Sequence, residues 1–198
     1  VACDRTTVGA LGQRNAAGTN WLARVHLGCT VAGTWILCDR LSHQGGLSAT
    51  PTTPQTTDLP TAALTRYTGG VGVVAAVEIY TQVGASGVGV TLDYTNQAGT
   101  GGQVSPAAVL GGTGYREAAR LLIMPLAASD TGVRSVESVT LSNNTGTAGA
   151  FGVTLFRPLL FCPIDMANSA QVTIDSFIHL GDLPEVVNDA CLFWIFVP

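Results

Sequence analysis

The sequence contains no lysine, and its nine basic residues are arginines scattered along 198 positions. With thirteen acidic residues, the formal net charge is −4. A nucleic-acid-binding surface needs a cluster of cations that neutralises several phosphates, and the sequence shows no such cluster. The missing lysine also excludes the phosphate-binding loop GxxxxGK[ST], which depends on one. We therefore expect no binding to nucleic acid.

Charge of either sign is scarce. Charged residues make up 11% of the chain and hydrophobic residues 46%, whereas an average soluble domain has about 25% charged residues. A monomer with so few charges is poorly protected against association. We expect part of the surface to be buried against other subunits in a homo-oligomer, a trimer being one closed arrangement. The alternative is a very apolar monomer.

Long apolar runs are also missing. The longest stretches, residues 151–164 and 191–197, are too short or too interrupted for the roughly 20 residues that a membrane-spanning helix needs. The first 30 residues lack the basic and apolar regions of a signal peptide. We therefore expect neither a membrane segment nor a signal peptide.

The five cysteines are an odd number, and they form no CxxC pair or zinc-type cluster with histidine. Their surroundings favour small buried side chains in a reducing cytosol. Disulfides between neighbouring subunits are the alternative. The five positions are Cys3, Cys29, Cys38, Cys162 and Cys191.

Short runs of branched and aromatic residues are separated by turns rich in Gly, Thr, Asn and Asp. Residues 72–82 and 88–95 alternate most clearly and are predicted to pair as a hairpin around the turn at 84–87. Residues 116–120 are compatible with a short helix. About eight strands are predicted in all, at 34–41, 72–82, 88–95, 120–126, 133–141, 151–161, 172–175 and 191–197. This pattern predicts an all-β fold, an antiparallel β-sandwich of jelly-roll type.

Two segments are predicted to lie outside the strands. Residues 1–30 are weakly patterned and are interpreted as an extended N-terminal arm that reaches a neighbour in an assembly. Residues 48–63 are rich in Thr and Pro, which excludes a helix and indicates a long extended loop. The predicted organisation is an arm at 1–30 followed by a single β-sandwich domain at 31–198.

No standard catalytic motif matches the sequence convincingly. We therefore predict that the chain is not an enzyme, binds no cofactor, and has no catalytic, cofactor-binding or metal-ligating residue. The glycine-rich segment 111–114 is interpreted as a turn, and residues 84–88 lack the last glycine of a GxSxG elbow. The three histidines, His26, His43 and His179, match no metal-ligand spacing. Cys38 beside Asp39 and His43 suggests a Cys-His pair, but neighbours on one strand point to opposite faces. We expect Asp39, Arg40 and His43 to tie a strand end to the following loop.

A carbohydrate site is the remaining chemical alternative. Glu78, Asp93 and Asp175 would form glycosidase-type carboxylate pairs if they faced one groove. Carboxylates on antiparallel strands are more often solvated or paired with arginine. Tyr80 and Tyr94 are the tyrosines that a lectin-like site would use.

Several short segments of the sequence resemble segments in a group of structural proteins from tailed bacteriophages and prophages. They are WILCDRLSHQGGL (35–47), RYTGGVGV (66–73), EIYTQ (78–82), YTNQAGT (94–100), DTGVRSV (130–136), GVTLF (152–156) and DACLF (189–193). The similarity covers most of residues 30–198. It implies a virion component and carries no catalytic residues.

Within that group we expect a head decoration (cement) protein, assembled in the host cytoplasm, that binds the major capsid protein and stabilises the shell. The arm at 1–30 and the loop at 48–63 would make the contacts. The alternatives are a tail or head–tail connector component, the main shell protein itself, or a carbohydrate-binding or carbohydrate-hydrolysing β-sandwich.

Overall fold

The computed structural model describes residues 1–13, 18–57, 64–167, 169–175 and 183–198. Strands, turns and bends make up these residues, with no helix among them. All the strand pairs given for them are antiparallel. The predicted all-β, antiparallel character is therefore confirmed for the part of the chain that is described.

The chain divides into two units. Unit 1 comprises Val1–Ala2 and Leu41–Phe156, and unit 2 comprises Cys3–Arg40 and Arg157–Pro198. Two long strands, β3 (Gly33–Leu47) and β11 (Ala150–Ile164), contribute residues to both units. The predicted division into an arm and a single domain stays a prediction.

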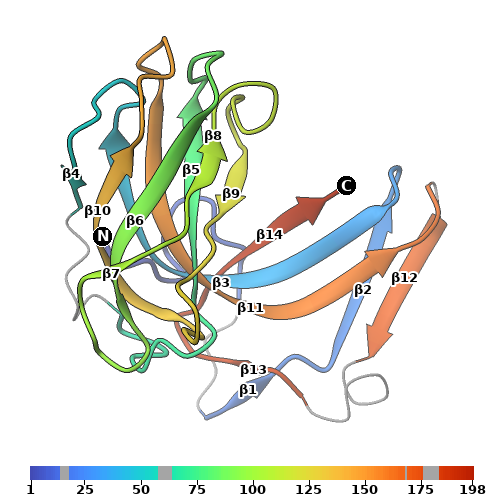
Figure 1. The fold of residues 1–198 in the computed structure, drawn as a ribbon. Helices are drawn as coiled ribbons and strands as arrows, with labels where there is room; N and C mark the ends of the chain where they lie inside the picture. The colour runs from blue at the N-terminus through green and yellow to red at the C-terminus, as the bar shows by residue number, and fades with distance from the viewer. Residues whose placement is uncertain (14–17, 58–63, 168, 176–182) are drawn as a thin grey trace. The chain divides into compact units, whose positions relative to one another are not determined.

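Unit 1 contains two sheets (Figure 1). The first has the order β4-β10-β6-β7, with β8 also paired to β6. Its strands are β4 (Gln55–Thr56), β6 (Val88–Asn96), β7 (Gln103–Val104), β8 (Ala108–Leu110) and β10 (Val133–Leu141). The second sheet has the order β14-β3-β11-β5-β9, and unit 1 holds its strands β5 (Val74–Thr81) and β9 (Leu121–Ile123) with parts of β3 and β11.

The core of unit 1 follows from the two-residue period of its strands. Val90, Leu92 and Tyr94 alternate along β6 and are fully buried. Ile79 of β5 and Phe151 of β11 belong to the same buried apolar cluster, so the two sheets share one core. The predicted inward face of residues 88–95 is confirmed. Burial of each such side chain contributes about 1.5–3 kcal/mol to stability.

The predicted hairpin between residues 72–82 and 88–95 is wrong, because β5 pairs with β11 and β9 while β6 pairs with β10, β7 and β8. The connection between them is held by a different loop. Ser86 N donates to the Thr145 carbonyl oxygen at 3.1 Å, and Gly84 N donates to the Thr145 hydroxyl at 3.1 Å. The connection between the two strands has six residues, 82–87, which is longer than a tight hairpin turn. It leads β6 into the other sheet.

Strand boundaries agree with the sequence where apolar runs are flanked by turns. The predictions 133–141 and 191–197 coincide with β10 and with β14 (Cys191–Val197). The predicted strand 34–41 instead continues as β3 through Gly45 and Gly46 to Leu47. Gly45 lies under the Tyr80 ring, whose nearest carbon would be 3.6 Å from an added Cβ. That distance is an ordinary van der Waals contact, so the packing at Gly45 does not require a glycine, and Gly45 does not end the strand.

The short helix that the sequence allowed at 116–120 is absent. The segment forms a turn instead, with Ala119 at φ 64°. Its backbone follows β5: Ala119 N donates to Ile79 O at 2.8 Å, and Ile79 N donates to Arg120 O at 3.0 Å. These bonds satisfy backbone groups that a helix would have used internally.

Unit 2 contains the first part of β3 paired with β14, from Thr34 opposite Val197 to Arg40 opposite Cys191. Two smaller sheets accompany this pair: β2 (Arg24–Cys29) with β12 (Ser169–Asp175), and β1 (Asn20–Trp21) with β13 (Glu185–Val186). The segment predicted as an arm at 1–30 therefore contains two strands. Its extended, outward-reaching form is not confirmed.

The apolar cluster of unit 2 is built around Leu37, Leu160 and Cys162, with Trp35 and Trp194 packed against it. The two indole rings meet edge to face with centroids 6.3 Å apart. Such aromatic pairs stabilise by about 0.5–1.5 kcal/mol beyond the area they bury. The cysteines behave as small buried side chains: none of the five forms a disulfide in the structure, four are buried, and Cys29 is half-buried.

Candidate functional site

Four polar side chains gather on the face of the second sheet that points away from the unit 1 core. They are His43 on β3, Glu78 and Tyr80 on β5, and Thr154 on β11, three strands that are neighbours in the sheet. Alternation places them there, because Val77, Ile79, Val153 and Leu155 fill the core face. We refer to these four residues as the His43 cluster.

Hydrogen bonds join the His43 cluster into a chain. Tyr80 Oη lies 2.9 Å from His43 Nε2, and His43 Nδ1 lies 2.9 Å from Thr154 Oγ1. Thr154 Oγ1 donates to Glu78 Oε2 at 2.7 Å, and His43 Nδ1 lies 3.7 Å from that same oxygen. Thr154 is fully buried, while the His43 and Glu78 side chains are 28% and 18% exposed.

The direction of these bonds follows from Glu78, because an ionised carboxylate only accepts. Thr154 gives its one hydroxyl proton to Glu78 and therefore accepts from His43, so Nδ1 carries the proton of the neutral ring. The free lone pair of Nε2 then accepts from the Tyr80 hydroxyl. For a neutral ring this arrangement favours the tautomer with the proton on Nδ1, and Nε2 then faces the Tyr80 hydroxyl.

Gly152 makes room for this cluster. A Cβ at that position would lie 2.1 Å from the Gln44 carbonyl oxygen and 2.5 Å from the Tyr80 hydroxyl. Nothing in the sequence around Gly152 singles it out, since its role depends on two strands that are distant in the chain. Sequence reasoning does not reveal the cluster for the same reason, although His43, Glu78 and Tyr80 are each candidate residues by themselves.

A base directed at a hydroxyl and oriented by a further group is the geometry that activates a nucleophile. Two features favour a structural role here. Thr154 is buried beneath the ring that it orients, and each group already bonds to the next in the chain. The cluster links three strands, which is the effect expected of a fully satisfied polar network.

Two of the carboxylates considered for glycoside hydrolysis, Glu78 and Asp93, lie on opposite sides of unit 1. Asp93 alternates with the buried Leu92 and Tyr94 on β6, so it points away from the core on the side opposite to Glu78. Asp175 lies in unit 2, where its carboxylate accepts from Arg24 Nη2 at 2.9 Å. Glu78 and Asp93 therefore cannot flank one glycosidic bond.

Tyr94 is fully buried and does not offer its ring to a sugar. Its hydroxyl donates to Asp130 Oδ2 at 2.6 Å and accepts from Ala127 N at 2.8 Å. Asn96 Nδ2 donates to the other Asp130 oxygen at 2.8 Å. Burial, followed by the hydrogen bond to Asp130, raises the pKa of Tyr94 to about 12. These contacts fasten the loop at 127–131 to β6.

The proposed Cys-His pair is not supported by the state of Cys38. The side chain is fully buried, and burial together with the neighbouring Asp39 carboxylate raises the pKa of its thiol to about 12. The reactive thiolate is therefore disfavoured at neutral pH. The expectation that Asp39, Arg40 and His43 tie a strand end to a loop is also wrong, because all three lie inside β3. Asp39 Oδ1 accepts from Cys191 N at 2.8 Å, and Arg40 lies over the Phe193 ring.

Residues 111–114 form the predicted turn, closed by Gly111 N donating to Tyr115 O at 2.7 Å. Val109, Tyr115 and Leu122 line a shallow depression of about 520 Å³ beside this turn. Of the histidines, His26 lies on β2, and His179 lies outside the described residues. The described part of the chain holds no group of three His, Cys, Asp or Glu side chains suited to a metal ion.

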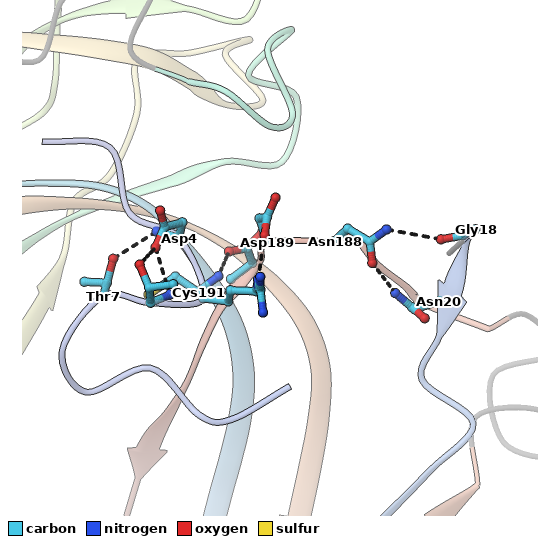
Figure 2. Close-up of polar contacts among 10 residues, drawn as sticks. Asp4, Thr7, Gly18, Asn20, Asn188, Asp189 and Cys191 are labelled. Atoms are coloured by element: carbon cyan, nitrogen blue, oxygen red, sulfur yellow. Dashed lines mark hydrogen bonds and ion pairs between the residues drawn. The ribbon is translucent and has the colours of Figure 1, made fainter. Parts of the chain in front are cut away.

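In unit 2 the N-terminal residues bind the segment that precedes β14 (Figure 2). Arg5 Nε donates to Asp189 Oδ1 at 2.7 Å, and Arg5 N donates to Asp189 O at 3.1 Å. Asn20 Nδ2 donates to Asn188 Oδ1 at 2.6 Å. The sequence offers no local signal for these contacts, because the partners are more than 160 residues apart.

Large apolar side chains remain exposed in both units. Phe161 is 58% exposed and Val197 is 47% exposed in unit 2, and Val109 is 61% exposed in unit 1. Phe161 alternates with Leu160 and Cys162, so it points away from the apolar cluster of unit 2. Single exposed apolar residues are ordinary, but here they accompany a surface with few charges.

Comparison with protein families, with curated proteins and with solved structures finds no match for this chain. No helix able to cross a bilayer occurs in the part of the chain that the structure describes.

Proposed function

We propose that this chain is a structural component of a tailed-bacteriophage virion, a head decoration (cement) protein built as a jelly-roll-like β-sandwich. In this proposal homo-oligomers, such as trimers, bind the major capsid protein on particles assembled in the host cytoplasm. The shell gains resistance to rupture from many small apolar contacts between subunits. The resemblance of residues 35–47, 66–73 and 130–136 to phage structural proteins supports the proposal that the particle is a bacteriophage virion.

The observation that carries an assembly role is the combination of exposed apolar side chains with 11% charged residues. A freely soluble monomer is normally protected by a more highly charged surface. The polar clusters around His43 and around Tyr94 bond within unit 1 and link its own strands and loops. A role in binding other subunits accounts for the exposed apolar side chains, and catalysis does not.

Particles with and without this protein provide the test. We expect particles that lack it to lose integrity at lower temperature or with less chelator, and added protein to restore the resistance. Particles of equal resistance would contradict cementing. A reconstruction of the particle distinguishes the alternative virion roles by copy number and position. A few copies at one vertex indicate a connector or tail component, and a continuous lattice indicates the main shell protein.

A carbohydrate-binding surface is the second candidate, and the half-buried Tyr80 ring beside Glu78 and His43 favours it. A glycan array with the wild-type chain and Glu78→Gln tests this function. Binding that is lost in the variant would support it, and an absence of binding would remove it.

A further inference from the structure

One side of unit 1 is formed by short strands at the ends of its two sheets. There β8 pairs with β6 in the first sheet, and β9 is the last strand of the second sheet (Figure 1). Both strands line the depression of about 520 Å³ beside the turn at 111–114, β8 through Val109 and β9 through Leu122. Apolar side chains on this side are open to solvent: Val109 is 61%, Ile123 48% and Tyr115 40% exposed. Sheet edges are normally covered or charged, so this side of unit 1 presents an open edge.

The hydrogen bonds of β9 leave its outer side unpaired. Ile79 N donates to Arg120 O at 3.0 Å, which is a bond between residues opposite each other on β5 and β9. Bonded pairs alternate with unbonded pairs in an antiparallel ladder, so Leu122 bonds to β5, whereas Leu121 and Ile123 turn their N–H and C=O groups away from it. No hydrogen bond within the described residues reaches these four groups.

The strand β8 has the same open side. Val109 lies opposite Gly89 of β6, but Gly89 N donates to Ser142 Oγ at 2.9 Å and Gly89 O accepts from Ser142 N at 2.8 Å. Because opposite residues in an antiparallel ladder exchange both bonds or neither, Val109 also turns its N–H and C=O groups away from its sheet. Unpaired backbone groups of both strands therefore lie beside the depression.

The ladder also determines where the side chains of a strand added to β9 would lie. Residues directly opposite each other point to the same face of a sheet, so the added residue opposite Leu122 shares its face. Leu122 is buried and lines the depression. A volume of about 520 Å³ lies within the range of about 300–1,000 Å³ that is typical of ligand pockets. The depression therefore accepts one large apolar side chain of the added strand.

The charge beside this edge indicates what kind of strand fits. Arg120 precedes β9 and is exposed, and its guanidinium forms no ion pair within the described residues. Segment 116–120 has two arginines and one glutamate, a net charge of +1. Residues 119–126 contain no acidic residue, so β9 of a second copy offers no carboxylate to Arg120. The complementary partner is a different segment that carries an acidic residue.

We infer that the outer edge of β9 binds an extended segment of a partner protein as an antiparallel strand. Two residues of that segment pair with Leu121 and Ile123, and the residue between them places a large apolar side chain against Leu122. The residue that follows this trio is acidic and faces Arg120. In this mode of recognition main-chain bonds give affinity and side-chain pockets give specificity. Pro125 has no N–H and limits the edge to these residues. The inference goes beyond the decoration role and does not depend on it.

Fluorescence polarisation with the labelled peptide Thr-Val-Phe-Val-Glu-amide and the full chain tests this edge. N-methylation of both valines removes the two N–H groups that face β9 and should weaken binding roughly tenfold. N-methylation of the phenylalanine, whose N–H faces away from β9, is the matched control and should change binding less than about twofold. Replacing the phenylalanine by alanine should also weaken binding roughly tenfold.

Variants of the chain test the same contacts from the other side. Ile123→Pro removes an outward N–H that β5 does not use, and it should weaken peptide binding, whereas Ile123→Thr keeps that N–H and should bind as the wild type does. A peptide that ends in lysine should bind about threefold less tightly at low salt, and Arg120→Glu should reverse this preference. Circular dichroism checks that each variant folds, and the N-methylated peptides test the same bonds without changing the protein.

Three results would overturn the inference. The first is a wild-type chain that does not bind the peptide. The second is binding that N-methylation of the valines and of the phenylalanine weakens equally, because the contact would then not be a β-ladder. The third is a wild-type dimer that Ile123→Pro dissociates, because the edge would then bind a second copy. All three are measured on the isolated chain, so peptide binding without any effect on shell resistance would reject the decoration role and leave the inference standing.

Discussion

Replacing Tyr94 by phenylalanine removes a buried hydroxyl of unit 1 that makes two hydrogen bonds. The ring stays in the core, so the substitution leaves no large cavity. The change removes the donor to Asp130 at 2.6 Å and the acceptor of Ala127 N at 2.8 Å. A hydrogen bond to a charged group contributes about 1.5–3 kcal/mol and a neutral one about 0.5–1.5 kcal/mol. We expect Tyr94→Phe to lower the free energy of unfolding by about 2–4 kcal/mol near neutral pH.

The same hydroxyl makes this loss depend on pH. The pKa of Tyr94 is about 12 in the folded chain and close to 10 in an unfolded chain. Because the unfolded chain releases this proton first, the stability that Tyr94 contributes is complete below pH 10. It is lost as pH rises towards 12, by about 3 kcal/mol for a shift of two units. The difference in stability between wild type and Tyr94→Phe should therefore shrink towards zero between pH 10 and 12.

Urea unfolding followed by far-ultraviolet circular dichroism measures both effects. Tyr115→Phe is the matched control, since Tyr115 is 40% exposed and no hydrogen bond of its hydroxyl is described. Its effect should stay within about 0.5 kcal/mol. An effect of Tyr94→Phe as small as that of the control would contradict this prediction, as would a parallel loss of stability in wild type and Tyr94→Phe from pH 8 to 12.

Three further results are expected. Gly84→Ala should destabilise unit 1 by about 3 kcal/mol, because the new Cβ would lie 1.7 Å from the Thr145 carbonyl oxygen. The control Gly114→Ala places its Cβ in open space and should leave the urea midpoint nearly unchanged. Equal midpoints for the two variants would contradict this prediction. Thr154→Val should cost about 1–3 kcal/mol and change the imidazole nitrogen resonances of its histidine neighbour, and unchanged resonances would show that the hydroxyl does not select the tautomer. A thiol reagent should label Cys29 of the native chain first, since the other four cysteines are at most 3% exposed; rapid labelling of all five would show that this burial is not maintained.

The direction in which strand residues point could be predicted from the sequence. Val88, Val90, Leu92 and Tyr94 were placed on one face, and all four are buried. That result needs only the two-residue period of an extended chain, which is a local property. The bounds of β10 and β14 were predicted for the same reason, because apolar runs ending in turn residues are visible without knowing the partner strand.

The partner of each strand was decided by tertiary structure. β5 and β6 looked like a hairpin, yet a six-residue connection bound to Thr145 carries the chain into the other sheet. Alternation specifies which face is buried and is silent on which strand lies alongside. The short helix considered at 116–120 failed similarly, because its backbone groups bond to β5.

The candidate site shows the same division. The sequence by itself determined a chain poor in charge, without lysine or a catalytic motif, whose strands bury one face. Only the folded chain brings His43, Glu78, Tyr80 and Thr154 into one hydrogen-bonded line, and only the folded chain seats Arg5 on Asp189. The physical reason is that periodicity acts over a few residues, whereas these contacts depend on which strands the shared core brings together.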